Sequence, residues 1–173
     1  MCGITGIYGL EQVDNAKARV EQMNLSLAHR GPDADGIYEA QNVILGHRRL
    51  SIIDLSAESN QPFTSANERY TLVFNGEVYN YKELKAELND YPFRTASDTE
   101  VVLAALTTWG IMAVRRFNGM FALAFWDGKE EKLWLARDRM GIKPLYIARA
   151  SDSVVFSSEV RSILKSGLIQ PTL

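Results

Sequence analysis

Segments with the residue pattern of β-strands gather toward both ends of the chain, and helix-like segments lie between them. Strand patterns fall on residues 3–8, 37–38, 43–45 and 70–74, and later on 120–126, 133–137, 145–147 and 154–157. Helical spacing of apolar residues covers 14–27, 81–88 and 97–109, and a last short helix is expected over 159–165. Alternating βαβ units would place a helix between successive strands, so this order predicts antiparallel sheets covered by helices, in the α+β class.

Local signals set the expected boundaries of several elements. Asp14 is expected to cap the first helix, and Ser97 followed by Glu100 has the spacing of a capping box. Residues 56–67, rich in Ser and Asn, are expected to form a loop. The dipeptide Asn75-Gly76 favours a tight turn at the end of a strand.

Composition narrows the class of protein. The chain has 173 residues, 46% of them hydrophobic, and a formal net charge of -2, which fits one globular domain. No apolar run approaches the ~20 residues of a membrane span and no secretory pattern opens the chain, so a cytoplasmic location without membrane contact is expected. The arginines form no basic run, which argues against nucleic acid. One cysteine excludes an internal disulfide, and only two histidines argue against a zinc site, so no metal is expected.

Cys2, the only cysteine, directly follows Met1, and its small side chain favours removal of an initiator methionine. Cys2 would then carry both a thiol and a free α-amine, groups that titrate near ~8.5 and ~8 when unperturbed. One residue could thus act as nucleophile and base. The following strand, with Ile4 and Ile7, would hold this end inside the fold. The alternative is that Cys2 is a small apolar residue at a frayed end.

Attack of a thiolate on an amide needs donors for the oxyanion, and the Asn75 side chain with the Gly76 N–H could supply them. An amino-acid substrate would also need a cation for its carboxylate and an anion for its ammonium, for which Arg49 and Asp98 are suited. Each has a plain structural alternative. Asn75-Gly76 could be only a turn, Arg49 a solvated surface residue, and Asp98 a carboxylate favoured at a helix N-terminus.

The two histidines leave a further option open. His29 or His47 could form a Cys-His pair with Cys2, or each could be a turn or core residue.

Eight short segments follow one another over almost the whole chain: Met1–Ile4, His29–Asp33, Arg49–Leu55, Gln61-Pro62, Asn75–Tyr81, Ser97–Glu100, Phe117–Ala122 and Ala136–Tyr146. In composition and order they closely resemble the glutaminase domain of glutamine-hydrolysing asparagine synthetases. These belong to the class II glutamine amidotransferases, within the N-terminal-nucleophile hydrolases. The resemblance implies a four-layer αββα sandwich of two antiparallel sheets, with the nucleophile at the start of a central strand.

The resemblance also implies a role for each matching position. The nucleophile falls on Cys2, the oxyanion hole on Asn75 and Gly76, the carboxylate-binding arginine on Arg49 and the ammonium-binding aspartate on Asp98. The rest of the glutamine pocket falls on Leu50, Ser51, Ile52, Ile53 and Glu77. Residues 29–33 are expected to shape a loop near the pocket.

The implied activity is hydrolysis of L-glutamine to glutamate and ammonia through a cysteine thioester. Residues 1–165 would form the glutaminase domain, and residues 166–173 a tail that begins a linker to an absent synthetase domain. No cofactor is expected in this chain, since ATP and Mg²⁺ would bind only in the synthetase domain or subunit that accepts the ammonia.

The sequence departs from the family pattern in two places: the Ser-Gly-Gly-x-Asp-Ser loop of that synthetase domain is absent, and Ala57–Asn60 replaces a glycine-rich run. Aspartate, another carboxylate or a sugar therefore stays open as the acceptor, and a homodimer stays open as the oligomeric state.

Two other functions remain as alternatives. If Met1 were retained and the amine blocked, the chain would be a non-catalytic interaction module with the same fold. A different amide substrate is the second, although Arg49 and Asp98 together suit an α-amino acid.

Overall fold

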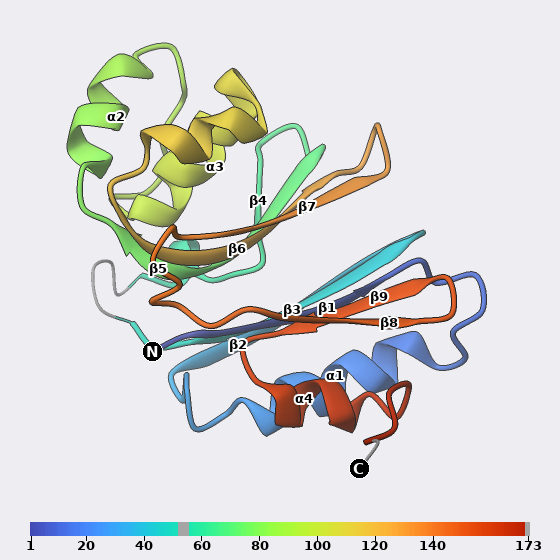
Figure 1. Cartoon of the computed structure of the whole chain (residues 1–173). Coiled ribbons are helices and arrows are strands. Elements are labelled where there is room, and N and C mark those ends of the chain that lie inside the picture. The colour runs from blue at the N-terminus through green and yellow to red at the C-terminus, as the bar shows by residue number, and fades with distance from the viewer. Residues whose placement is uncertain (52–55, 172–173) are drawn as a thin grey trace.

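The computed structural model describes residues 1–51 and 56–171. Two antiparallel sheets lie face to face, and helices cover the outer face of each (Figure 1). This is a four-layer αββα sandwich, so the predicted α+β class and layer arrangement are confirmed.

The first sheet has five strands in the order β2-β3-β1-β9-β8. Their bounds are β1 Gly3–Tyr8, β2 Ala34–Ala40, β3 Val43–Arg49, β8 Tyr146–Ala150 and β9 Ser153–Ser157. β1 lies in the middle and pairs with β3 and β9. Cys2, the residue before β1, therefore lies at one end of the central strand.

Both faces of this sheet pack against other layers, and its strands therefore carry apolar residues at successive positions. Ile44 belongs to the apolar cluster on the helix side, whereas Val43 and Leu45 belong to the cluster between the sheets. Successive side chains of a strand point to opposite faces, so a strand buried on both reads as a continuous apolar run.

The helices on this sheet are α1, Ala16–Ser26, and α4, Val160–Lys165. Val20 and Met23 of α1 pack against the sheet, and the Ser162 hydroxyl of α4 donates to the Met23 carbonyl at 3.1 Å. The predicted Asp14 cap is wrong. The N-cap is Asn15, whose φ of 54° lies in the left-handed region and whose side chain makes no capping bond. Asn tolerates this conformation better than most residues, and the chain enters the helix through it.

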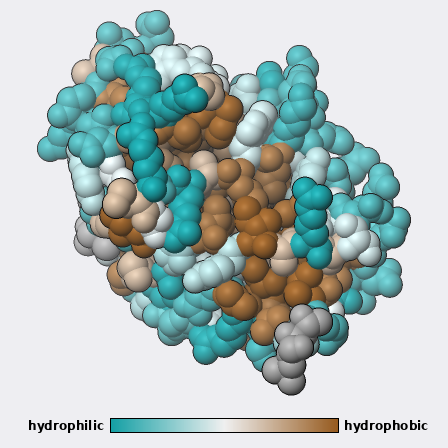
Figure 2. Space-filling model, in the orientation of Figure 1, coloured by the Kyte–Doolittle hydropathy of each residue, from teal (hydrophilic) through white to brown (hydrophobic). Residues whose placement is uncertain are grey.

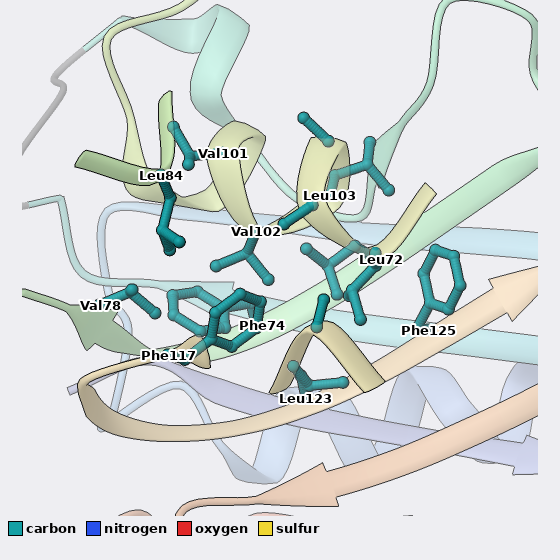
Figure 3. Close-up of a cluster of buried hydrophobic side chains, with 14 of the residues drawn as sticks. Leu72, Phe74, Val78, Leu84, Val101, Val102, Leu103, Phe117, Leu123 and Phe125 are labelled. Carbon is teal, nitrogen blue, oxygen red and sulfur yellow. The ribbon is translucent and has the colours of Figure 1, made fainter. Parts of the chain in front are cut away.

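The second sheet has the strand order β4-β5-β6-β7. The bounds of its strands are β4 Phe63–Thr64, β5 Tyr70–Val78, β6 Gly119–Asp127 and β7 Lys132–Arg137. Helices α2, Tyr81–Glu87, and α3, Asp98–Trp109, cover its outer face, and two 3₁₀ segments are η1 Ala57–Ser59 and η2 Ile111–Arg116. In Figure 3, Val102 of α3 points down toward the sheet, where Phe74 and Leu123 project upward.

Helix α3 is buried from Asp98 to Leu106 because α2 and η2 pack on it as well as the sheet. Ser97 is its N-cap and accepts a bond from the Glu100 N–H, as predicted. The Glu100 carboxylate does not return that bond. It accepts from the Arg94 and Thr95 N–H groups instead, which closes the preceding turn.

The two sheets meet through an apolar layer drawn from both, including Ile4 and Phe156 from the first and Val73 and Trp126 from the second. On the face shown in Figure 2, brown hydrophobic surface crosses the middle of the molecule, where the sheets lie, between teal hydrophilic regions. A buried polar contact also joins the layers: His47 Nε2 of β3 bonds the Phe74 carbonyl of β5 at 3.2 Å.

Two further expectations about local structure are wrong. Asn75-Gly76 is not a turn, because β5 continues through both residues to Val78 and pairs with β6 along its whole length. A β-carbon at Gly76 would collide with the backbone of Met120 and Phe121, so close approach of β6 explains this glycine. The expected loop 56–67 contains η1 and the short strand β4.

The chain after α4 stays close to the first sheet. The Ser166 carbonyl accepts a bond from Arg19, and Leu168 and Ile169 pack against the cluster under α1. Within residues 1–51 and 56–171, no helix combines the length and apolar character that crossing a membrane requires.

Candidate functional site

A cavity of about 280 Å³ lies at the Cys2 end of β1 and is lined by residues from both sheets and from the start of α3. Seven of the ten predicted site residues line it: Cys2, Arg49, Leu50, Asn75, Gly76, Glu77 and Asp98. Ser51 does not, and Ile52 and Ile53 lie outside the described residues.

Cys2 is half-buried, with its thiol against the end of β3. The Leu50 N–H donates to Sγ at 3.4 Å, and Sγ lies 3.6 Å from the Leu50 carbonyl. Cys2 is therefore held in the fold, and the alternative of a frayed end is wrong.

The loop at residues 29–33 supports both Cys2 and the end of β3. Arg30 Nε donates to the Cys2 carbonyl at 3.0 Å, and the Asp33 carboxylate accepts from the Ser51 N–H at 2.8 Å. A β-carbon at Gly31 would collide with the backbone of Arg48. The loop is therefore packed directly under the site, in line with the shaping role expected for it.

Asn75 is 1% exposed and lies within β5. Its side-chain nitrogen is buried and has no hydrogen-bond partner among the described residues. An unpaired buried donor costs ~1–3 kcal/mol, and such groups in native proteins usually serve a purpose. Here the donor belongs to a residue that lines the cavity beside Cys2.

Arg49 is the last residue of β3 and is 7% exposed, so the alternative of a solvated surface arginine is wrong. Its Nη1 donates to the Ser56 carbonyl at 2.8 Å and to Asn60 Oδ1 at 2.7 Å. These bonds fix the guanidinium at the wall of the cavity.

Asp98 is the first residue of α3 and is 5% exposed. Burial raises the pKa of its carboxyl from 3.8 to about 6, although the N–H groups of Val78 and Thr99 oppose the shift, and the negative charge of Glu77 adds to it. The position is both a helix N-terminus and part of the cavity wall, so the structure is compatible with either use proposed for Asp98.

Neither histidine lines the cavity. His29 is exposed and contacts Glu159 and Arg161. His47 is fully buried, and burial lowers its pKa to about 3, opposed by its bond to the Phe74 carbonyl and reinforced by Arg49. His47 is a neutral core residue that joins β3 to β5 next to Asn75, and the described contacts give no Cys-His pair.

Sequence reasoning missed several residues of the cavity wall, among them Ser59, Gln61, Thr99, Met120 and Lys143. Gln61 Oε1 accepts from the Phe74 N–H at 2.6 Å, so it braces the strand that carries Asn75. Gln61 and Lys143 both lie in segments that carried the family resemblance, and a polar residue inside such a segment was the available signal.

The cavity thus combines one thiol, one unpaired amide donor, two buried cations, Arg49 and Lys143, and the buried carboxylate of Asp98. Such a set can bind a zwitterion and attack an amide attached to it. Within the described residues, no three His, Cys, Asp and Glu side chains group closely enough to hold a metal ion.

Comparisons with known proteins agree with this geometry. A family model described as a glutamine amidotransferase domain matches residues 1–173. Glutamine-hydrolysing asparagine synthetase 1 of Bacillus subtilis is 43% identical over 169 residues, which are 95% of this chain and 27% of that protein. Glutamine-hydrolysing asparagine synthetase 2 of Oryza sativa subsp. japonica is 39% identical over 165 residues, 94% of this chain and 28% of that protein.

A solved structure shares the fold. The glutamine phosphoribosylpyrophosphate amidotransferase of B. subtilis, complexed with ADP and GMP, aligns with a TM-score of 0.82. The alignment covers 96% of this chain and 44% of that one at 24% identity, which supports the fold alone.

Proposed function

The chain belongs to the glutamine amidotransferase domain family, and from this premise we propose that it hydrolyses the side-chain amide of L-glutamine to glutamate and ammonia. The observation that carries the proposal is the cavity that gathers Cys2, Asn75, Arg49 and Asp98. Their chemistry matches the two ends of glutamine, an amide and an α-amino acid group.

The reaction would begin once the residue before Cys2 is removed and its α-amine is free. The amine takes the thiol proton, and Sγ attacks the amide carbon, forming a C–S bond while the carbonyl electron pair moves to oxygen. The Asn75 side chain and the Gly76 N–H donate to that oxyanion. Its collapse breaks the C–N bond, the amine returns the proton to the leaving nitrogen, and water then hydrolyses the thioester to glutamate.

Recognition of the amino-acid end would use opposite charges. Arg49 holds the α-carboxylate and Asp98 the α-ammonium, with Leu50, Ser51, Ile52, Ile53 and Glu77 completing the pocket. The negative charge of Glu77 helps to raise the pKa of Asp98, so an ammonium bound beside Asp98 would offset that repulsion.

The ammonia would pass to a synthetase domain or subunit. The chain spans 27% of the length of the first relative it matches, so that relative has much additional chain outside the match. We assign ATP and Mg²⁺ to that part, no cofactor to this chain, and aspartate as the acceptor by analogy with the names of the relatives. The boundary at residue 165, a homodimer and a cytoplasmic location stay predictions.

Labelling with a glutamine-analogue diazoketone tests the proposal. Glutamate release should stop as one adduct mass appears, and peptide mapping should find the adduct on Cys2. The intact mass before labelling should show a chain that starts at Cys2. Full retention of Met1 together with no turnover would instead support the non-catalytic module.

Arg49→Lys should raise KM for glutamine about tenfold or more, with a smaller effect on kcat. Lysine keeps the charge but not the planar two-point grip on a carboxylate. Steady-state glutaminase assays measure both constants. Arg48→Lys is the matched control, because Arg48 precedes it on β3 and bonds the Asn24 carbonyl on the opposite face. An unchanged KM in Arg49→Lys would remove Arg49 from the carboxylate site.

Asp98→Asn should raise KM yet stabilise the folded protein at pH 7.5. The folded state holds the Asp98 proton more tightly than the unfolded chain, so its stabilising contribution is full below about pH 3.8 and lost above about pH 6. Keeping this carboxylate buried and charged then costs on the order of 3 kcal/mol of folding free energy at pH 7.5, and an Asn side chain, which is neutral, avoids that cost. Wild-type KM should also rise as pH falls through about 6, because the protonated carboxyl no longer attracts an ammonium.

Thermal unfolding and pH-dependent assays check both parts. Asp14→Asn serves as the control, since Asp14 is exposed and should change neither Tm nor KM. A lower Tm with an unchanged KM in Asp98→Asn would contradict the assignment.

A further inference from the structure

Lys143 contributes a cation to the cavity wall, and no side chain of the described structure forms an ion pair with it. It is 7% exposed and lines the cavity with Cys2 and Gly76. The contacts among residues 1–51 and 56–171 give its ammonium no hydrogen bond and no ion pair. Its nitrogen is also not among the side-chain atoms sealed from solvent without a partner. Lys143 is therefore a buried lysine of the cavity wall whose charge the described contacts leave unpaired.

The backbone of Lys143 is fixed near the proposed oxyanion hole. Phe121, the partner of Gly76 in the β5–β6 ladder, donates its N–H to Asp138 Oδ2 at 3.1 Å. The same oxygen accepts the Lys143 N–H at 3.1 Å, and Arg137 Nε donates to the Lys143 carbonyl at 2.6 Å. One carboxylate therefore ties Lys143 to the residue beside Gly76.

A charge count of the cavity wall separates Lys143 from the other ionic groups. The wall carries Arg49 and Lys143 as cations and Asp98 and Glu77 as anions. The zwitterionic end of bound glutamine pairs its carboxylate with Arg49 and its ammonium with Asp98 and Glu77. Lys143 then has no opposite charge in the ground state. Beyond these pairs, negative charge develops in the cavity only when the Cys2 thiolate forms and attacks.

We propose that Lys143 is a further catalytic group of this site, whose ammonium stabilises the thiolate and the oxyanion that follows it. This inference rests on the proposed function. In this proposal Lys143 acts through its charge and transfers no proton, and the proton transfers remain those of the Cys2 amine. An interaction present in the transition state and weak in the bound substrate changes kcat and leaves KM nearly constant.

The experiment compares Lys143→Met and Lys143→Arg with wild type. Lys143→Met should lower kcat roughly tenfold, as expected for the loss of one charge near the reacting atoms, with KM within about twofold. Alkylation of Cys2 by iodoacetamide, a neutral reagent that needs only the thiolate, should slow in parallel at pH 7. Lys143→Arg should recover most of both rates, which a merely structural role would not predict.

Lys132→Met is the charge-matched control. Lys132 is exposed, and on β7 it lies opposite Asp127 in the strand register, at the far end of β6. Asp127 is roughly 23 Å along the strand from Met120, which lines the cavity, at ~3.3 Å per residue. This control should leave kcat, KM and alkylation unchanged. If Lys143→Met raises KM alone, Lys143 binds substrate instead, and if it changes neither kcat nor alkylation, the inference is wrong. Absence of glutamine turnover in wild type would defeat the proposed function, whereas the alkylation rates would still test Lys143.

Discussion

Cys2→Ala is expected to abolish glutamine hydrolysis, by on the order of 10⁴-fold or more, while the fold stays intact. No other thiol exists in the chain to replace the nucleophile. The structural cost is small because, among the described residues, the hydrogen bonds of Sγ are the two with Leu50, at 3.4 and 3.6 Å, and sulfur is a weak hydrogen-bonding atom. Glutamate release and the thermal midpoint should be measured on one preparation.

The outcome that matters most for Cys2 is residual activity. Turnover of Cys2→Ala above one thousandth of wild type would mean that another group attacks the amide. A midpoint that falls by more than a few degrees would instead indicate that the thiol helps to hold β1.

Asn75→Ala is expected to lower kcat by roughly a hundredfold or more, about 3 kcal/mol, with little change in KM. The structure sharpens the second half of this prediction. Asn75 lies in a strand and its side-chain nitrogen is buried without a partner in the described part of the chain, so Ala removes an unsatisfied donor. Thermal stability should stay level or rise, although a small cavity partly offsets the gain.

Asn89→Ala provides the matched control, since Asn89 is exposed in the connection between α2 and α3. It should leave kcat and the midpoint unchanged. A lower midpoint with wild-type kcat in Asn75→Ala would show that Asn75 serves the sheet, and the Gly76 N–H would remain as the only proposed donor.

The layer arrangement could be predicted from the chain because strand and helix periodicities are local. The run Val43-Ile44-Leu45 and the pair Ile4 and Ile7 each signal a strand whose two faces are both buried. The turn at Asn75-Gly76 was mispredicted for the opposite reason. The dipeptide favours a turn locally, but pairing of β5 with β6 over its full length outweighs that preference.

The site shows the same division. Cys2, Asn75, Arg49 and Asp98 could be proposed because each residue type suits a step of the chemistry, and the cavity brings them together. Lys143 and Ser59 could not be proposed, because a single lysine or serine forms no distinctive sequence pattern. Their burial in the wall of this cavity depends on contacts between residues distant in sequence. The N-cap at Asn15 could not be predicted either, because its left-handed conformation depends on the path by which the chain enters the helix.

The continuation of β5 through Asn75 and Gly76 affects how the site responds to heat. Both residues belong to a ladder that pairs Tyr70–Val78 with Gly119–Asp127, and interior strands of this kind open only with the cooperative unfolding of their whole unit. Sites built on loops usually loosen before the protein melts, but here the two proposed oxyanion donors are expected to share the melting transition of the sheet. Amide exchange at these two positions should accordingly follow global unfolding, and activity should persist up to the melting temperature.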